Sequence, residues 1–70
     1  MPENKALADA VKLLRKNMHQ NQFEFASNCG ISIETLSLIE RQKTNPTLET
    51  IQKIAAYADL TVADLLKIKY

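Results

Sequence analysis

The chain contains few of the residues that cross-link small domains, such as Cys, or that interrupt helices, such as Gly and Pro. Its 70 residues include one Cys, one Gly, two Pro and no Trp. A single Cys excludes an internal disulfide and a zinc site built from cysteines, and a small domain without such staples suits a reducing compartment. No apolar run has the length of a signal peptide or a membrane span. We therefore expect one soluble domain in the cytoplasm that makes no contact with a membrane.

Positive charge is scarce in the middle of the chain. Nine Lys and Arg against eight Asp and Glu leave a net charge of +1, which is too small for a strong bulk attraction to nucleic acid. Between Asn17 and Glu40 the sequence has no Lys or Arg, whereas Glu24 and Glu34 lie inside this stretch. A basic surface must therefore come from local clusters on either side of it. The candidates are Lys12, Arg15, Lys16, Arg41 and Lys43.

Apolar residues recur at helical spacing along the whole chain. In the first segment Leu7, Val11, Leu14 and Met18 follow at intervals of four, three and four, which places them on one face of a helix. Similar patterns continue without a linker, repeat or low-complexity segment. They predict an all-α fold of five helices: about residues 4–17, between Asn21 and Gly30, Ile33–Arg41, from Thr47 to a break at Asp59, and from Thr61 through Ile68.

Residues with capping side chains precede the last four of these helices. Asn21, with Glu24 three positions later, has the pattern of a reciprocal capping box. Ser32, Thr47 and Thr61 are suited to cap the three helices that follow. The apolar face of the fourth helix consists of Leu48, Ile51, Ile54, Ala55 and Ala58, and that of the fifth consists of Val62, Leu65, Leu66 and Ile68.

Residues 22–41 have the pattern of a helix-turn-helix. Two helices that cross steeply need a small residue where they touch, a glycine at the turn and apolar residues that pack the second helix on the first. Ala26 is the small residue, and Gly30, four positions later, is the turn glycine. The packing residues are Ile31, Leu36 and Ile39, with Phe25 and Cys29 on the inner face of the first helix. At that position Cys29 is predicted to be a buried, unreactive thiol.

These motifs resemble the phage-repressor/Cro-like (XRE) family of helix-turn-helix regulators over about residues 7–68. The matching segments are Leu14-Arg15, Asn21-Gln22-x-x-Phe25-Ala26, Gly30-Ile31-Ser32, Leu36-x-x-Ile39-Glu40, Asn45-Pro46-Thr47-Leu48 and Leu60-Thr61-Val62-x-x-Leu65-Leu66. The resemblance implies a compact lambda-repressor-like fold and a sequence-specific DNA-binding regulator, either a repressor or a small controller-type protein. In that family the second helix of the motif lies in the DNA major groove and the first crosses the backbone.

The resemblance also implies roles for individual residues. The side chains that would meet base edges are Ser32, Ile33, Glu34, Ser37 and Leu38. Those that would meet the DNA backbone are Asn21, Gln22, Arg41, Lys43 and Asn45. Arg15 and Glu40 match a structural ion pair that ties the first helix to the third. The family commonly binds two-fold sites as dimers, and we expect a homodimer through about Asp59–Ile68, where spare aliphatic side chains collect.

The chain departs from the family at two helix ends. Family members usually carry glycine at the positions of Gln42 and Asp59. A left-handed backbone conformation is therefore expected at both, and it is less favourable for Gln42 than for Asp59. His19, alone in a polar connection, is predicted to be a surface residue.

The outward residues of the motif leave a second interpretation open. Ile33 and Leu38 offer only methyl surface, which suits thymine methyl groups or a protein partner, while Glu34 could accept from a cytosine amino group. Phe23 and Leu13 are expected to cover the edge of the core; alternatively, Phe23 joins Ile33 and Leu38 in a docking patch. The alternative function is thus a protein-interaction module, an antagonist or co-regulator with the same fold. Nothing places a nucleophile, a base and an orienting group around a pocket, so we expect no enzyme, no cofactor and no metal site.

Overall fold

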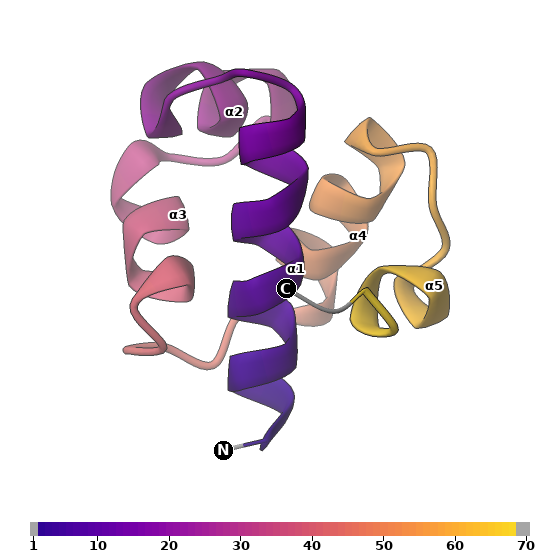
Figure 1. The fold of residues 1–70 in the computed structure, drawn as a ribbon. Coiled ribbons are helices and arrows are strands. Elements are labelled where there is room, and N and C mark those ends of the chain that lie inside the picture. Colours follow the sequence, from indigo (N-terminus) through magenta and orange to yellow (C-terminus); the bar gives the residue numbers. More distant parts are fainter. Residues whose placement is uncertain (1, 69–70) are drawn as a thin grey trace.

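The computed structural model describes residues 2–68, which form five α-helices. They are α1 (Pro2–Asn17), α2 (Gln22–Cys29), α3 (Ile33–Glu40), α4 (Leu48–Tyr57) and α5 (Val62–Leu66). In Figure 1, α1 runs through the middle of the molecule, with α3 on one side of it and α4 and α5 on the other, while α2 lies near its C-terminal end. The predicted all-α fold is confirmed. No helix in residues 2–68 is both long and apolar enough to cross a membrane.

The helices begin at the caps that the sequence predicts. The Asn21 Oδ1 atom accepts from the backbone N–H of Glu24 at 2.8 Å, and the Glu24 carboxylate accepts from the backbone N–H of Asn21 at 2.9 Å. The hydroxyls of the other three caps each accept from the backbone N–H three residues later; these caps are Ser32, Thr47 and Thr61. Each such bond satisfies an N–H group that the helix itself leaves without a partner.

Four of the helices end at a residue with a left-handed backbone. Gly30 has φ of 81°, Gln42 and Asp59 both have φ of 59°, and His19 has φ of 56°. At each of these ends the N–H of the following residue donates to the carbonyl five positions earlier, which closes the last turn. The left-handed conformations predicted for Gln42 and Asp59 are confirmed, and the exposed position of His19 is confirmed as well. The left-handed conformation of His19 was not predicted, although histidine is one of the non-glycine residues enriched in that conformation.

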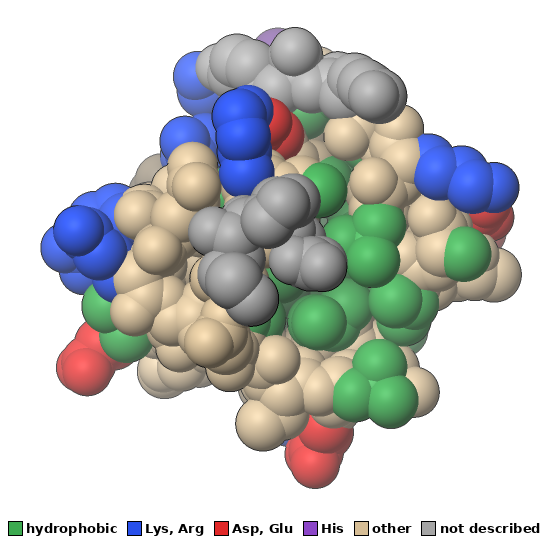
Figure 2. All heavy atoms as spheres, turned by 90° about the horizontal axis from the view of Figure 1, so that it is seen from below, with side chains coloured by type: hydrophobic (Ala, Val, Ile, Leu, Met, Phe, Trp, Pro, Cys, Tyr) green, Lys and Arg blue, Asp and Glu red, His purple; other side chains and the backbone are tan. Residues whose placement is uncertain are grey.

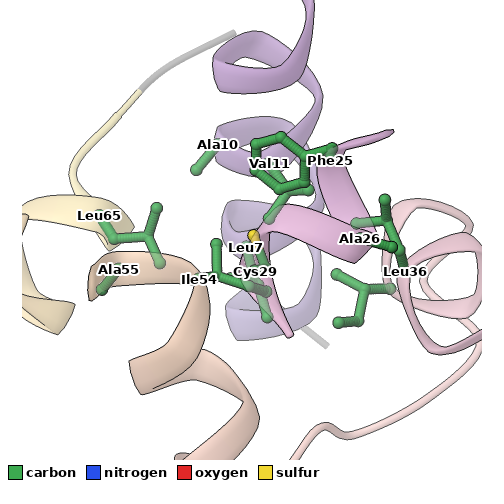
Figure 3. Close-up of a cluster of buried hydrophobic side chains, with 11 residues drawn as sticks. Leu7, Ala10, Val11, Phe25, Ala26, Cys29, Leu36, Ile54, Ala55 and Leu65 are labelled. Carbon is green, nitrogen blue, oxygen red and sulfur yellow. The ribbon is translucent and has the colours of Figure 1, made fainter. Parts of the chain in front are cut away.

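All five helices contribute side chains to one core. Figure 3 shows these side chains converging between α1, α2, α4 and α5, with α3 closing one side. The cluster consists of Leu7, Ala10, Val11, Phe25, Ala26, Cys29, Leu36, Ile39, Ile54, Ala55 and Leu65. At its edge the ring of Tyr57 meets that of Phe25 edge-on, with centroids 5.5 Å apart and planes at 80°. This contact joins α4 to α2 in a geometry that aromatic pairs prefer.

The structure corrects several helix ends predicted from the sequence. Helix α5 ends at Leu66 because its last turn tightens: the Lys67 N–H donates to the Asp64 carbonyl three residues back. Ile68 therefore lies outside the helix, although it still packs on the core. Helix α3 ends at Glu40 with Arg41 as its cap residue, and α1 begins at Pro2, slightly earlier than predicted.

Three apolar side chains, those of Phe23, Leu48 and Leu66, are more exposed than a core role allows, with Leu66 at 36%. Leu48 is 61% exposed, because it lies in the first turn of α4, and Phe23 is 65% exposed. The interpretation of Phe23 as a cover for the core edge is therefore wrong, whereas Leu13 is half-buried.

Candidate nucleic-acid interface

Helix α3 has two faces with different tasks. Its inward face carries Leu36, Ile39 and Glu40, all buried. On the outward side, residues 33 and 37 and residues 34 and 38 are four apart, so these pairs share one surface of the helix. The structure thus brings together the five residues assigned to base edges: Ser32, Ile33 and Glu34 are exposed, and Ser37 and Leu38 are half-buried.

The hydroxyl group of Ser32 already has partners within the protein. It accepts from the Thr35 backbone N–H at 3.0 Å and donates to the Thr35 hydroxyl at 2.8 Å. Because its O–H donor and one of its two acceptor lone pairs are used in these bonds, Ser32 serves first as the cap of α3. The outermost side chains of this face are then Ile33, which is 46% exposed, and Glu34.

The residues assigned to the DNA backbone lie at the two ends of the motif. Asn21 and Gln22 stand at the start of α2, where helix N–H groups favour anions. Arg41 and Lys43 follow α3, and both are exposed. Asn45 is tied to the start of α1, since its side-chain oxygen accepts from the Asn4 amide at 2.8 Å. The hydrogen bond from Gln22 to Glu40 brings the start of α2 close to the end of α3, which Arg41 and Lys43 follow.

A buried carboxylate holds the motif to α1. Glu40 is 5% exposed and accepts from Arg15 Nε at 2.8 Å and from Arg15 Nη2 at 3.0 Å. A third donor is Gln22 Nε2 at 3.1 Å, and Arg15 Nη1 also donates to the Gln20 carbonyl at 3.2 Å. The predicted ion pair between Arg15 and Glu40 is confirmed. Because Arg15 is committed to this carboxylate, its proposed share in the basic surface is wrong.

Sequence reasoning missed the third member of this cluster. Gln22 was assigned to a phosphate, yet its side chain is half-buried and donates to Glu40. A side-chain amide carries two N–H donors, so one remains for another acceptor while the first binds Glu40. No pattern in the chain links positions 22 and 40, which meet only because α2 and α3 cross.

A second polar link was also missed. The Tyr57 hydroxyl accepts from Gln20 Nε2 at 2.7 Å and from Asn28 Nδ2 at 3.1 Å. These contacts join the connection after α1 and the end of α2 to the last residue of α4. The oxygen of the same Gln20 side chain, Oε1, is buried and has no hydrogen-bond partner among the described residues. The position of Tyr57, three residues after Ile54 on the inward side of α4, was the available signal.

The cysteine takes no part in the interface. Cys29 is buried at the end of α2, as predicted, and burial raises the pKa of its thiol to about 11. The nucleophilic thiolate is therefore almost absent near neutral pH.

Known proteins resemble this chain in sequence, and a solved structure resembles it in fold. Residues 11–65 match the family described as helix-turn-helix. The chain is 38% identical over 61 residues to the HTH-type transcriptional regulator DdrOP3 of Deinococcus deserti, covering 87% of this chain and 47% of that protein. It is 32% identical over 66 residues to the antitoxin HigA1 of Mycobacterium tuberculosis, covering 94% of this chain and 44% of that protein. The chain thus spans about half the length of these relatives.

A solved structure has the same arrangement of helices. It is the crystal structure of the hypothetical transcription factor NHTF from Neisseria, which superposes with a TM-score of 0.84 at 33% sequence identity. The match covers 91% of this chain and 74% of that one. The five-helix fold around the motif is therefore shared with a protein whose title describes a transcription factor.

Proposed function

The chain belongs to the helix-turn-helix family, and from this membership we propose that it binds double-stranded DNA as a transcriptional regulator. The observation that supports the proposal best is the outward face of α3, which is free of the core and is followed by the exposed Arg41 and Lys43. The family and the regulators among the relatives point to such a protein rather than to an enzyme, and they do not favour the alternative of a protein-interaction module. With DNA as the ligand, we propose that the protein acts in the cytoplasm.

In this proposal α3 lies in the major groove and the start of α2 meets the backbone. The base-facing side chains are those of Ser32, Ile33, Glu34, Ser37 and Leu38. Phosphates are held by Arg41 and Lys43 after α3 and by the α2 N-terminus with Asn21 and Gln22, with Asn45 in the loop between α3 and α4. Few cations take part, so each monomer contributes only modest affinity.

Because each monomer contributes only modest affinity, we propose that the protein binds DNA as a homodimer. Figure 2 shows hydrophobic side chains gathered on the face seen from below, on the side where α4 and α5 lie in Figure 1. Of the apolar side chains on or just after α4 and α5, Leu48 is 61% exposed and Leu66 is 36% exposed, and Ile51, Val62 and Ile68 are half-buried. Pairing through this surface, which we call the α4–α5 surface, would extend the predicted Asp59–Ile68 interface to Leu48. Two copies of α3 would then lie about 34 Å apart, one turn of DNA.

Sedimentation velocity tests the dimer. Leu48→Gln should shift the protein toward monomer, since one large apolar side chain is lost from each copy, and burial of such a side chain contributes about 1.5–3 kcal/mol. Phe23→Gln is a matched control, because Phe23 is as exposed as Leu48 but lies on α2. A wild-type protein that remains monomeric over the whole accessible concentration range would refute the dimer.

Selection of bound fragments from random duplexes, followed by a salt titration, tests the function itself. A DNA binder should lose affinity with a log–log slope of about −0.9 per phosphate contact. Lys43→Ala should weaken binding to all sequences about equally and reduce the slope by roughly one contact, whereas Glu34→Ala should change the preferred sequence. Lys53→Ala, on α4, is the control and should leave both unchanged. The proposal fails if the wild type binds no duplex at about 50 mM salt.

A further inference from the structure

An apolar hollow lies on the outer surface of the motif, where α2 and α3 meet. It has a volume of about 250 Å³ and is lined by Phe23, Ala26, Ser27, Ile31, Ser32 and Ile33. This volume is below the roughly 300–1,000 Å³ typical of pockets that enclose small molecules. The hollow therefore suits a shallow contact with the edge of a larger partner better than the capture of a metabolite.

Two side chains stand at the rim of this hollow and point away from the core. Phe23 is 65% exposed and Ile33 is 46% exposed, although both are large and apolar. Ile33 is the first residue of α3, and Phe23 is the second residue of α2. The rim is thus placed at the N-terminal end of the helix that enters the groove, where recognition helices contact base edges.

The polar groups around the hollow have limited capacity to read bases. The Ser32 hydroxyl is bonded twice to Thr35, and the Asn21 side chain and the Glu24 carboxylate are paired with each other's backbone. Residues 33–40 contain no Lys or Arg, so α3 cannot form the common bidentate contact of Arg with guanine. Apart from the exposed carboxylate of Glu34, what remains at the start of α3 is the apolar surface of Ile33, next to that of Phe23 on α2.

We propose that Ile33, backed by Phe23, contacts the 5-methyl group of a thymine and so selects thymine at one position of each half-site. This inference rests on the proposed function and names the chemistry that the same site reads. The thymine methyl is the one apolar group that the standard base pairs display in the major groove, and aliphatic or aromatic side chains are its usual partners. The neighbouring Glu34 can accept from a cytosine amino group but offers nothing to the methyl group.

Replacement of thymine by uracil in the selected operator tests this directly, because uracil lacks only the methyl group. Each thymine of the operator is replaced in turn, and affinity is measured by fluorescence anisotropy at constant salt. Loss of one buried methyl should weaken binding about fourfold at one position, and roughly fifteenfold when both half-sites are changed. Substitution at all other thymines should have little effect.

Protein variants assign the effect to its residue. Ile33→Ala should bind the thymine and uracil operators about equally, while Phe23→Ala should reduce the discrimination without abolishing it. Both side chains are exposed, so both variants should keep the wild-type circular dichroism spectrum. Glu34→Ala is the control, and it should keep the full fourfold preference for thymine whatever it does to neighbouring positions.

The possible failures are distinguishable. A protein that binds its selected operator but is indifferent to uracil at every position overturns the methyl contact and leaves the proposed function intact, as does an operator without thymine opposite α3. Discrimination that survives in Ile33→Ala overturns the assignment to Ile33. If no duplex is selected at all, the proposed function and this inference fall together, and the exposed apolar rim would instead serve a protein partner.

Discussion

The ion pair between Arg15 and Glu40 predicts a large and specific loss of stability when only one partner is removed. Arg15→Met keeps most of the apolar stem of the side chain but removes the guanidinium group. Of the hydrogen-bond donors to Glu40 among the described residues, the Gln22 amide at 3.1 Å would then remain, and Glu40 is 5% exposed in the native protein. A buried charge that loses its partner typically costs about 3–5 kcal/mol.

This cost is large relative to the whole stability of the domain. A chain of 70 residues has an unfolding free energy of roughly 3.5–10 kcal/mol at 0.05–0.15 kcal/mol per residue. Arg15→Met should therefore leave the protein at the margin of folding at 25 °C. Removing the charge as well, in Arg15→Met/Glu40→Met, should recover most of the loss, because a buried ion pair replaced by apolar residues of similar size is often near neutral.

Urea unfolding followed by far-ultraviolet circular dichroism measures these values, which suits a helical protein without tryptophan. Lys5→Met is the matched control: Lys5 lies 2.6 Å from Asp9, but its side chain is 66% exposed, so a loss of at most about 0.5 kcal/mol is expected. A loss below about 1 kcal/mol in Arg15→Met, or a double variant less stable than the single one, would refute the role assigned to the buried charge.

Further predictions concern a helix end, the thiol and the tyrosine. Gln42→Gly should raise the unfolding free energy by about 0.5–1 kcal/mol in urea titrations, because φ is 59° there, and Asp59→Gly should gain less; equal gains would contradict the reasoning. Iodoacetamide at pH 8 should alkylate Cys29 slowly in the native protein and rapidly in urea. Burial raises the pKa of Cys29 in the folded protein from 9.0 to about 11, so the unfolding free energy should fall as pH rises from 9 to 11, where the unfolded thiol ionises and the folded one does not. An unfolding free energy that stays constant over this pH range would contradict the burial of the thiol. Tyr57→Phe should cost about 1–2 kcal/mol, because Gln20 and Asn28 lose their shared acceptor, and a neutral effect in thermal melts would show that water replaces it.

Much of the fold could be predicted because its determinants are local. The capping box at Asn21 and Glu24 spans three residues, and the left-handed end at Gly30 is set by the glycine itself, whereas that at Gln42 was anticipated through the family resemblance. Hydrophobic periodicity then assigns inward faces such as that of Leu36 and Ile39. Helix ends were less accurate, and α5 ends early because the Lys67 N–H bonds three residues back, a choice between hydrogen bonds of similar energy.

The candidate site was less predictable because it depends on how helices cross. The contact of Gln22 with Glu40 joins positions 18 apart, and that of Gln20 with Tyr57 joins positions 37 apart. Neither pair has a periodic pattern. The pairing of Arg15 with Glu40 was anticipated only through the family resemblance. The structure shows in addition that this pairing removes Arg15 from the basic surface.

The two faces of α3 have separate roles, one in folding and one in recognition, and this separation has consequences for evolution. Leu36, Ile39 and Glu40 face inward and hold the fold together, whereas Ile33 and Glu34 are exposed on the outward side and are not part of the buried core. Substitutions at the two outward positions can therefore change what the helix recognises with little penalty to folding. A duplicated copy of such a gene could acquire a new target in one or two mutational steps and remain stable at each of them.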